Sequence, residues 1–129
     1  MRIEIENLTK RYGDRTVLNI DNIIFEEGKI IGITGPNGSG KTTLLNIIGG
    51  IDGEYNGNVY YNGKNLDNET KRNMTYLFQK PYLFRRSVYE NIAYPLKLRD
   101  YANDNIKDFT NAIMENLEIE DLKDLKAHK

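Results

Sequence analysis

The residues best suited to chemistry lie in one glycine-rich stretch, Gly35-Pro-Asn-Gly-Ser-Gly-Lys-Thr42. This stretch, here called the phosphate loop, matches the pattern G-x-x-x-x-G-K-[ST], in which backbone N–H groups at a helix N-terminus surround phosphate oxygens. Gly35, Gly38 and Gly40 let the backbone wrap closely around an anion, because side chains there would block the approach. The alternative is a glycine-rich turn without a ligand. The complete match favours a nucleotide-phosphate site.

The last side chains of the loop would supply positive charge and a metal contact. Lys41 would place an ammonium group beside the β- and γ-phosphates, and Thr42 would offer its hydroxyl to Mg²⁺. Thr43 can reach the side of the α-phosphate. The predicted nucleotide-binding residues are Gly35, Pro36, Asn37, Gly38, Ser39, Gly40, Lys41, Thr42 and Thr43.

Hydrophobic patterning indicates which elements hold this loop. The run Lys29–Thr34 contains three Ile between turn signals, which predicts a central parallel strand covered on both faces. Apolar residues recur at helical spacing over residues 41–48, and Gly49-Gly50 would end that helix. Strand, glycine loop and helix in this order are the context that the motif requires.

Further strands and helices are expected around this unit. Alternating polar and apolar residues predict a half-buried strand over Arg2–Leu8. Ser87 can cap a short helix, residues 87–90, with Glu90 in capping-box position and Pro95 interrupting it. Other short strands are expected at Val17–Ile20, Ile23–Phe25, Gly57–Tyr61 and Met74–Phe78, and amphipathic helices, read as ordinary core packing, at Ile106/Phe109/Ile113/Leu117 and at Leu122/Leu125.

Composition excludes several classes of protein. Lys and Arg minus Asp and Glu gives 18 − 19 = −1, so we expect no nucleic-acid binding by a broad basic field. The chain has no Cys and one His, His128, which leaves no disulfide framework, thiolate metal site or histidine-based triad. No apolar run approaches the ~20 residues of a membrane span. The expectation is a soluble, cytoplasmic-type globular chain.

Residues 35–43, followed by Leu44-Leu45, resemble the phosphate loop of the ATP-binding cassette (ABC) ATPases. Lys10-Arg-Tyr-Gly13 is similar to the turn of that family in which an aromatic ring, here Tyr12, stacks on adenine. Without the resemblance, Tyr12 is one of nine tyrosines and would be interpreted as an ordinary surface aromatic residue.

A third segment, Leu77-Phe-Gln-Lys-Pro-Tyr-Leu-Phe84, resembles the family's segment whose glutamine touches Mg²⁺ and the attacking water. In this sequence that residue is Gln79, which by itself would be interpreted as a solvated residue at a strand end. The resemblance therefore implies ATP and Mg²⁺ as cofactors, with Thr42 and Gln79 as metal contacts.

The resemblance also implies an α/β fold of the P-loop NTPase type, with N-terminal antiparallel β strands, the Walker A strand-loop-helix and the start of the helical subdomain. Residues 1–85 would hold the β-subdomain and part of the P-loop core, and residues 86–129 the start of the helical subdomain. The family's Ser-Gly-Gly signature, Asp-Glu strand and switch histidine do not occur in these 129 residues. We therefore expect an incomplete domain that binds nucleotide weakly and does not turn it over. We also expect it either to be aggregation-prone or to self-associate through an unpaired strand edge.

Tyr82, Leu83 and Phe84, followed by two Arg, form either a local packing cluster or a docking surface for a transmembrane permease. The resemblance implies the latter, with a full-length head-to-tail homodimer held on the inner face of the cell membrane by its permease. Residues 79–93 are similar to importers of small oxyanions such as tungstate, molybdate or phosphate. The alternatives are an ABC ATPase without a transporter and a naturally short nucleotide-binding module.

Overall fold

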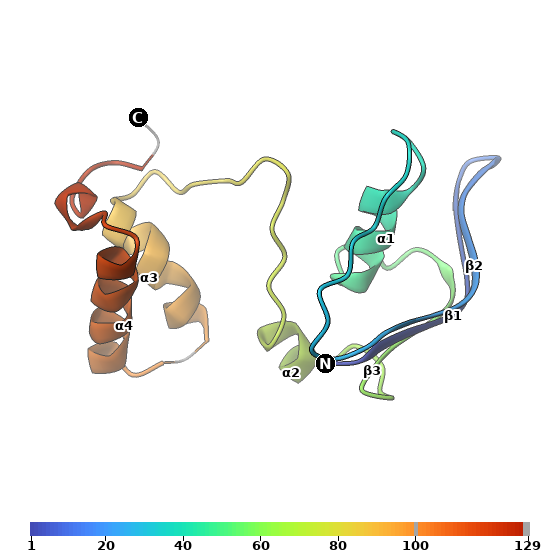
Figure 1. The fold of residues 1–129 in the computed structure, drawn as a ribbon, viewed down its shortest axis with the longest axis horizontal. Coiled ribbons are helices and arrows are strands. Elements are labelled where there is room, and N and C mark those ends of the chain that lie inside the picture. The colour runs from blue at the N-terminus through green and yellow to red at the C-terminus, as the bar shows by residue number, and fades with distance from the viewer. Residues whose placement is uncertain (100, 128–129) are drawn as a thin grey trace. The chain divides into compact units, whose positions relative to one another are not determined.

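The structure is a computed structural model that describes residues 1–99 and 101–127, so His128 lies outside the described residues. The chain forms two compact units, Met1–Tyr76 and Leu77–Lys129, which are described separately (Figure 1). The functional boundary expected after residue 85 is a different division and stays a prediction. The elements are β1 (Ile3–Tyr12), β2 (Arg15–Phe25), α1 (Lys41–Ile48), β3 (Asn56–Tyr61), α2 (Asn68–Arg72), α3 (Val88–Leu98), α4 (Asn103–Asn116) and the 3₁₀ turn η1 (Glu120–Leu122).

The first unit contains a three-stranded antiparallel sheet in the order β2-β1-β3. The strands expected at Arg2–Leu8 and Gly57–Tyr61 are confirmed, with β1 extending further to Tyr12. β2 is one continuous strand rather than the two short ones expected, because pairing with β1 continues through Asn22, opposite Glu6. Cross-strand hydrogen bonding outweighs the low strand propensity of the Asp-Asn pair.

The pairing of β1 with β3 shifts register between Glu6 and Thr9. Asn7 has φ +49° there, and Gly57 on the facing strand has φ +96°. A Cβ atom on Gly57 would collide with the carbonyl oxygen of Asn7. Gly57 is therefore the residue that lets the two backbones approach at this bulge.

Helix α1 lies on one face of the sheet and closes the core of the unit (Figure 1). Its buried residues, Leu44 and Ile47, follow the helical spacing seen in the sequence, and the helix ends at Gly49 as expected. The phenol of Tyr61 on β3 donates a hydrogen bond to the Ile48 carbonyl oxygen at 2.6 Å. The buried core consists of Ile5, Leu8, Leu18, Leu44, Ile47, Val59 and Tyr61.

Two expected strands are not formed. Residues 29–34 and 74–78 are irregular, and Ile30 is fully exposed. The expectation of strands there is wrong for this structure, for a physical reason. A parallel strand exists only through hydrogen bonds to its neighbours, and within residues 1–99 and 101–127 no strand pairs with either segment. The loop and helix that follow residue 34 form without that support.

In the second unit, α3 begins at Ser87 with the expected capping box. Ser87 Oγ accepts a hydrogen bond from the Glu90 N–H, and the Glu90 carboxylate accepts one from the Ser87 N–H. The helix is longer than expected, because it continues through Pro95 to Leu98. Helix α3 packs against α4, and Ala93 within α3 is fully buried. Tertiary packing of this kind outweighs the helix-breaking tendency of Pro95.

The helix expected from the apolar stripe is present as α4, but the interpretation of that stripe as core is wrong for three of its four residues. Ile106 is buried, whereas Phe109, Ile113 and Leu117 are exposed. The buried face instead consists of Ile106, Thr110 and Met114, spaced four residues apart. Thr110 can lie inside because its hydroxyl donates to the Ile106 carbonyl at 2.6 Å. The short helix expected at Leu122 and Leu125 is only the 3₁₀ turn η1.

Candidate functional site: the phosphate loop

The phosphate loop joins the irregular segment 29–34 to the first residue of α1. Gly35, Gly38 and Gly40 all have positive φ, of +151°, +77° and +91°. A Cβ atom on Gly40 would lie 2.7 Å from Leu18 Cδ2 and 2.9 Å from the Val17 carbonyl oxygen, both on β2. Gly40 is therefore required by sterics as well as by its dihedral angles. It seats the start of α1 on the sheet and leaves the rest of the loop exposed.

The ammonium group of Lys41 is held across the loop. Lys41 Nζ donates to the carbonyl oxygens of Gly35 at 2.7 Å and Pro36 at 2.8 Å, and lies 3.5 Å from Ser39 Oγ. These contacts keep the Lys41 ammonium group beside the loop backbone rather than in bulk solvent. An ammonium group has three donors, so an anion entering the loop can take over one or more of these hydrogen bonds.

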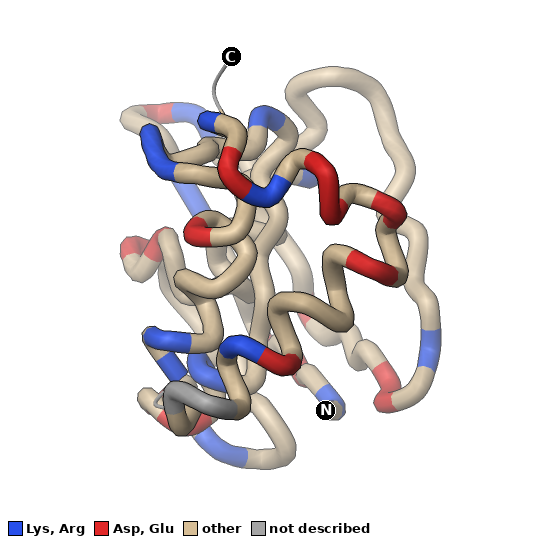
Figure 2. Tube along the Cα trace, turned by 90° about the vertical axis from the view of Figure 1, so that its left-hand side faces the viewer, with Lys and Arg blue, Asp and Glu red and all other residues tan. Residues whose placement is uncertain are grey.

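The positive charge available to an anion at the loop comes from the loop itself and not from a broad basic surface. Basic and acidic residues are interspersed along the chain (Figure 2). Helix α1 has no acidic residue in its first turn, so nothing there opposes the positive end of the helix dipole. The unpaired N–H groups at the start of α1 and the Lys41 ammonium thus combine in one exposed place. This arrangement suits a phosphate group.

Mg²⁺ fits this loop as a partner of a phosphate ligand rather than as an independently bound ion. Thr42 is exposed at the first turn of α1, and within the described part of the chain its hydroxyl has no hydrogen-bond partner. No group of three or more His, Cys, Asp or Glu among the described residues could enclose a metal. Mg²⁺ commonly uses one or two protein oxygens together with phosphates and water, which is what Thr42 could offer.

Tyr12 lies at the end of the β1–β2 hairpin, in the same unit as the loop. Tyr12 is 53% exposed, so part of the residue is accessible to a flat base. The hairpin is linked to the loop through Leu18, which pairs with Lys10 on β1 and whose side chain faces Gly40. Lys10, two residues before Tyr12, is buried and bound to Asp52, a pair that the sequence reasoning missed. Alternation along β1 could have marked Lys10 as inward-facing, but no local signal marks Asp52 as its partner.

Gln79 lies in the second unit, in the irregular segment before α3, and its side chain is exposed. Its role toward Mg²⁺ and water stays a prediction. The residues after it do form a cluster. The rings of Phe84 and Tyr94 lie 4.7 Å apart, and the Arg86 guanidinium lies 5.9 and 5.6 Å from their centroids. The Tyr82 ring meets that of Phe84 edge-on at 5.9 Å.

The cluster is both packed and exposed. Tyr82, Leu83 and Phe84 are 79%, 49% and 39% exposed. Asn91 on α3 fixes the turn that carries them, because its amide oxygen accepts from the Phe84 N–H at 2.8 Å and its amide nitrogen donates to the Phe84 and Ser87 carbonyls. This arrangement is compatible both with local packing and with a docking surface.

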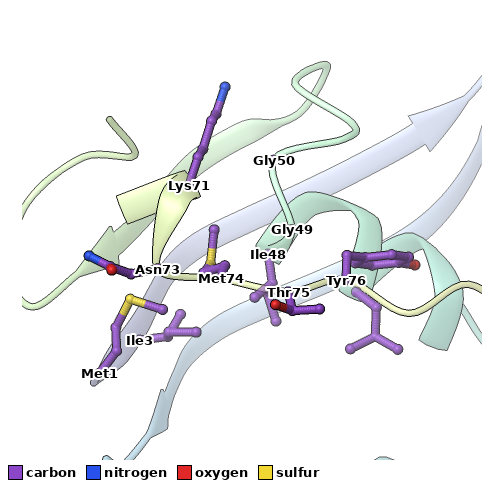
Figure 3. A pocket seen from close by; sticks show the side chains of 11 residues that line it. Met1, Ile3, Ile48, Gly49, Gly50, Lys71, Asn73, Met74, Thr75 and Tyr76 are labelled. Carbon is purple, nitrogen blue, oxygen red and sulfur yellow. The ribbon is translucent and has the colours of Figure 1, made fainter. Parts of the chain in front are cut away.

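A cavity of about 580 Å³ lies elsewhere in the first unit, between the end of α1, the start of β1 and residues 71–76 (Figure 3). Its lining is largely apolar, with Met1, Ile3, Ile48 and Met74 among its residues. None of the predicted nucleotide-binding residues lines it.

Among the helices that the structure describes, none has both the length and the apolar character of a membrane span.

Comparison with known proteins identifies the family of this chain. The family model described as ABC transporter matches residues 18–129. The chain is 53% identical over 129 residues to the tungstate uptake system ATP-binding protein TupC of Peptoclostridium acidaminophilum. It is 38% identical over 125 residues to the sulfate/thiosulfate import ATP-binding protein CysA of Mesostigma viride. It is 34% identical over 130 residues to the spermidine/putrescine import ATP-binding protein PotA of Haemophilus ducreyi.

These alignments cover 100%, 95% and 98% of this chain but only 60%, 36% and 34% of the three relatives. The structure of cbiO1 from Clostridium perfringens, part of the ABC transporter complex cbiONQ, superposes with a TM-score of 0.79 at 27% identity. That superposition covers 98% of this chain and 54% of cbiO1, which confirms the expected α/β fold of P-loop NTPase type. The chain belongs to the ABC transporter family.

Proposed function

We propose that this chain is the nucleotide-binding part of the ATP-binding subunit of an ABC importer, and that it binds MgATP at the phosphate loop. The observation that carries the proposal is the placement of Lys41. Its ammonium is bound at 2.7 and 2.8 Å to loop carbonyls at the N-terminus of α1, with no acidic residue in the first helical turn. A preorganised positive site of this kind is suited to a polyphosphate.

The remaining side chains have separate roles in this proposal. Backbone N–H groups of residues 35–43 and the Lys41 ammonium bind the phosphates, and Thr42 contributes its hydroxyl to Mg²⁺. Tyr12 stacks on the adenine ring, which its 53% exposure permits. Stacking does not read the edges of a base, so we expect weak discrimination between ATP and GTP. Gln79 would orient Mg²⁺ and the attacking water.

Hydrolysis needs a carboxylate that polarises water, and no residue of this chain is identified with that role. We therefore propose that the 129-residue chain binds ATP weakly without turning it over. In the whole protein, two subunits would bind ATP head to tail. Multiple-turnover ATPase activity of this chain, abolished by Lys41→Ala, would contradict this part of the proposal.

Transport is proposed from the relatives. TupC and CysA are named for tungstate and for sulfate and thiosulfate, all small oxyanions, whereas PotA is named for polyamines. The higher identity to TupC favours an oxyanion importer. We propose that Tyr82, Leu83 and Phe84 contact the permease and thereby hold the subunit at the inner face of the membrane. Loss of co-purification of the permease with a Phe84→Ala variant of the whole protein would support this contact.

The phosphate site is tested by titrating the chain with MgATP and following the heat of binding. Replacing Lys41 with Ala removes a charge-assisted contact, so we expect affinity to fall about tenfold or more. Lys29→Ala, at another exposed lysine of the same unit, is the matched control and should bind normally. Equal affinities of Lys41→Ala and the unaltered chain would exclude the phosphate loop as the site.

A further inference from the structure

Lys10 is a buried lysine with two hydrogen-bond acceptors in the protein interior. It is 2% exposed, and its Nζ donates to Asp52 Oδ1 at 2.8 Å and to the Glu54 carbonyl oxygen at 2.6 Å. Asp52 Oδ1 also accepts the Glu54 N–H at 3.0 Å. The pair therefore ties β1 to the segment that follows α1, across a sequence separation of 42 residues.

The same pair reaches Tyr12 from two sides. The Tyr12 phenol donates to the second carboxylate oxygen, Asp52 Oδ2, at 3.3 Å. The Lys10 ammonium lies over the Tyr12 ring, 4.9 Å from its centroid. Lys10 thus contacts the ring and Asp52 contacts the phenol oxygen, while 53% of the residue remains exposed. The ammonium lies over one face of the ring, so a base that stacks on Tyr12 would have to use the other face.

Stability alone does not require such a pair. An ion pair removed from water loses hydration, and apolar residues of similar volume often serve the fold equally well. The hydrogen bond between the two groups raises the pKa of Lys10 and lowers that of Asp52, so both are charged at neutral pH. A charged pair at this place, with its second carboxylate oxygen bound to a tyrosine, has directional contacts that apolar residues lack.

We propose that the Lys10–Asp52 pair is a positioning device that fixes the Tyr12 ring in the orientation in which it stacks on the nucleotide base. This inference rests on the proposed function, because it assigns Tyr12 to the base. Without the pair, the exposed ring would be free to adopt other rotamers and would have to be ordered on each binding event. Ordering one such side chain costs about a threefold to tenfold loss of affinity.

The test compares affinities of the 129-residue chain for ATP and for inorganic tripolyphosphate, which has no base. Asp52→Ala removes the hydrogen bonds of the carboxylate to Lys10, Tyr12 and Glu54. We expect it to weaken ATP binding about threefold to tenfold while tripolyphosphate binding is unchanged. Tyr12→Phe keeps the ion pair and removes only the phenol contact, so its loss for ATP should be smaller. Glu4→Ala, which breaks the Arg2–Glu4 pair elsewhere on β1, is the matched control and should change neither affinity. Titrations are made below the melting temperature of every variant.

A double variant separates positioning from general structural damage. In a Tyr12→Ala background, Asp52→Ala should cause no further loss of ATP affinity. Equal weakening of ATP and tripolyphosphate, an additive loss in the double variant, or an unchanged ATP affinity for both Asp52→Ala and Tyr12→Phe would overturn the positioning role. If Tyr12→Ala binds ATP normally, the stacking role of Tyr12 fails with it. Failure of the phosphate site would be recognised separately, as absent tripolyphosphate binding in the unaltered chain.

Discussion

At the scale of single residues, Lys41 and Lys10 show two uses of the same side chain. Lys41 is bound only to neutral oxygens of the loop and can exchange them for an anion. Lys10 is bound to a carboxylate in the protein interior and cannot. The sequence was sufficient to predict Lys41, because its motif is local. It was insufficient for Lys10, because Asp52 becomes its neighbour only after the chain has folded.

Tyr61 offers a residue-scale prediction. Burial raises the pKa of its phenol from 10.0 to about 12, and the phenol donates to the Ile48 carbonyl at 2.6 Å. The folded state therefore holds the proton more tightly than the unfolded state does. The stabilisation from Tyr61 is fully present below pH 10 and is lost as pH rises towards 12. In an ultraviolet titration, this tyrosine should ionise close to pH 12.

Tyr61→Phe should remove that late ionisation and lower the free energy of unfolding by about 1 kcal/mol at neutral pH, because the hydrogen bond to α1 is lost. Tyr60→Phe, at the neighbouring position of the same strand, is the control and should have little effect. If the same late ionisation persisted in Tyr61→Phe, its assignment to this residue would be wrong.

At the scale of elements, local patterns were sufficient where an element carries its own stabilising contacts. The capping box of Ser87 and Glu90 and the apolar face of α1 are encoded within a few residues, and both are as expected. The segments 29–34 and 74–78 have strand-like sequences but are irregular. Their hydrogen-bond partners would have to come from other strands, and no pattern within a segment can supply these.

Gly57 offers a prediction at this scale. Gly57→Ala would place a Cβ atom against the Asn7 backbone at a φ of +96°, so β1 and β3 would have to separate. We expect the free energy of unfolding to fall by roughly 2 kcal/mol or more, measured by urea denaturation. Gly53→Ala is the matched control, because nothing lies within 4 Å of the added atom. A loss no larger than that of Gly53→Ala would contradict the described bulge.

At the scale of the whole molecule, the exposed apolar segment before the loop has a consequence for association. Ile30 is fully exposed and Ile31 is 45% exposed, in a segment that pairs with no strand among the residues that the structure describes. Such segments recruit other chains. We expect the 129-residue chain to show a mass above that of a monomer in light scattering at high concentration, and Ile30→Lys to lower that mass.

Ile51→Lys is the control, because Ile51 is also exposed but lies outside that segment. A clean monomer for the unaltered chain at high concentration, or an equal effect of the two lysine substitutions, would count against association through residues 29–34. The family and the fold could be predicted from three motifs in order along the chain: residues 10–13, the phosphate loop and residues 77–84. Self-association is different, because it depends on which backbone groups remain unpaired in the folded chain.

The proposed function depends on binding of the ATP phosphates by the phosphate loop. The most direct measurement is an amide ¹H–¹⁵N spectrum of the 129-residue chain, recorded during titration with MgATP. We expect large shifts of the amide resonances of residues 38–43, and we expect these shifts to be absent in Lys41→Ala at the same ATP concentration. A saturating titration that leaves these resonances in place while others move would show that ATP binds elsewhere.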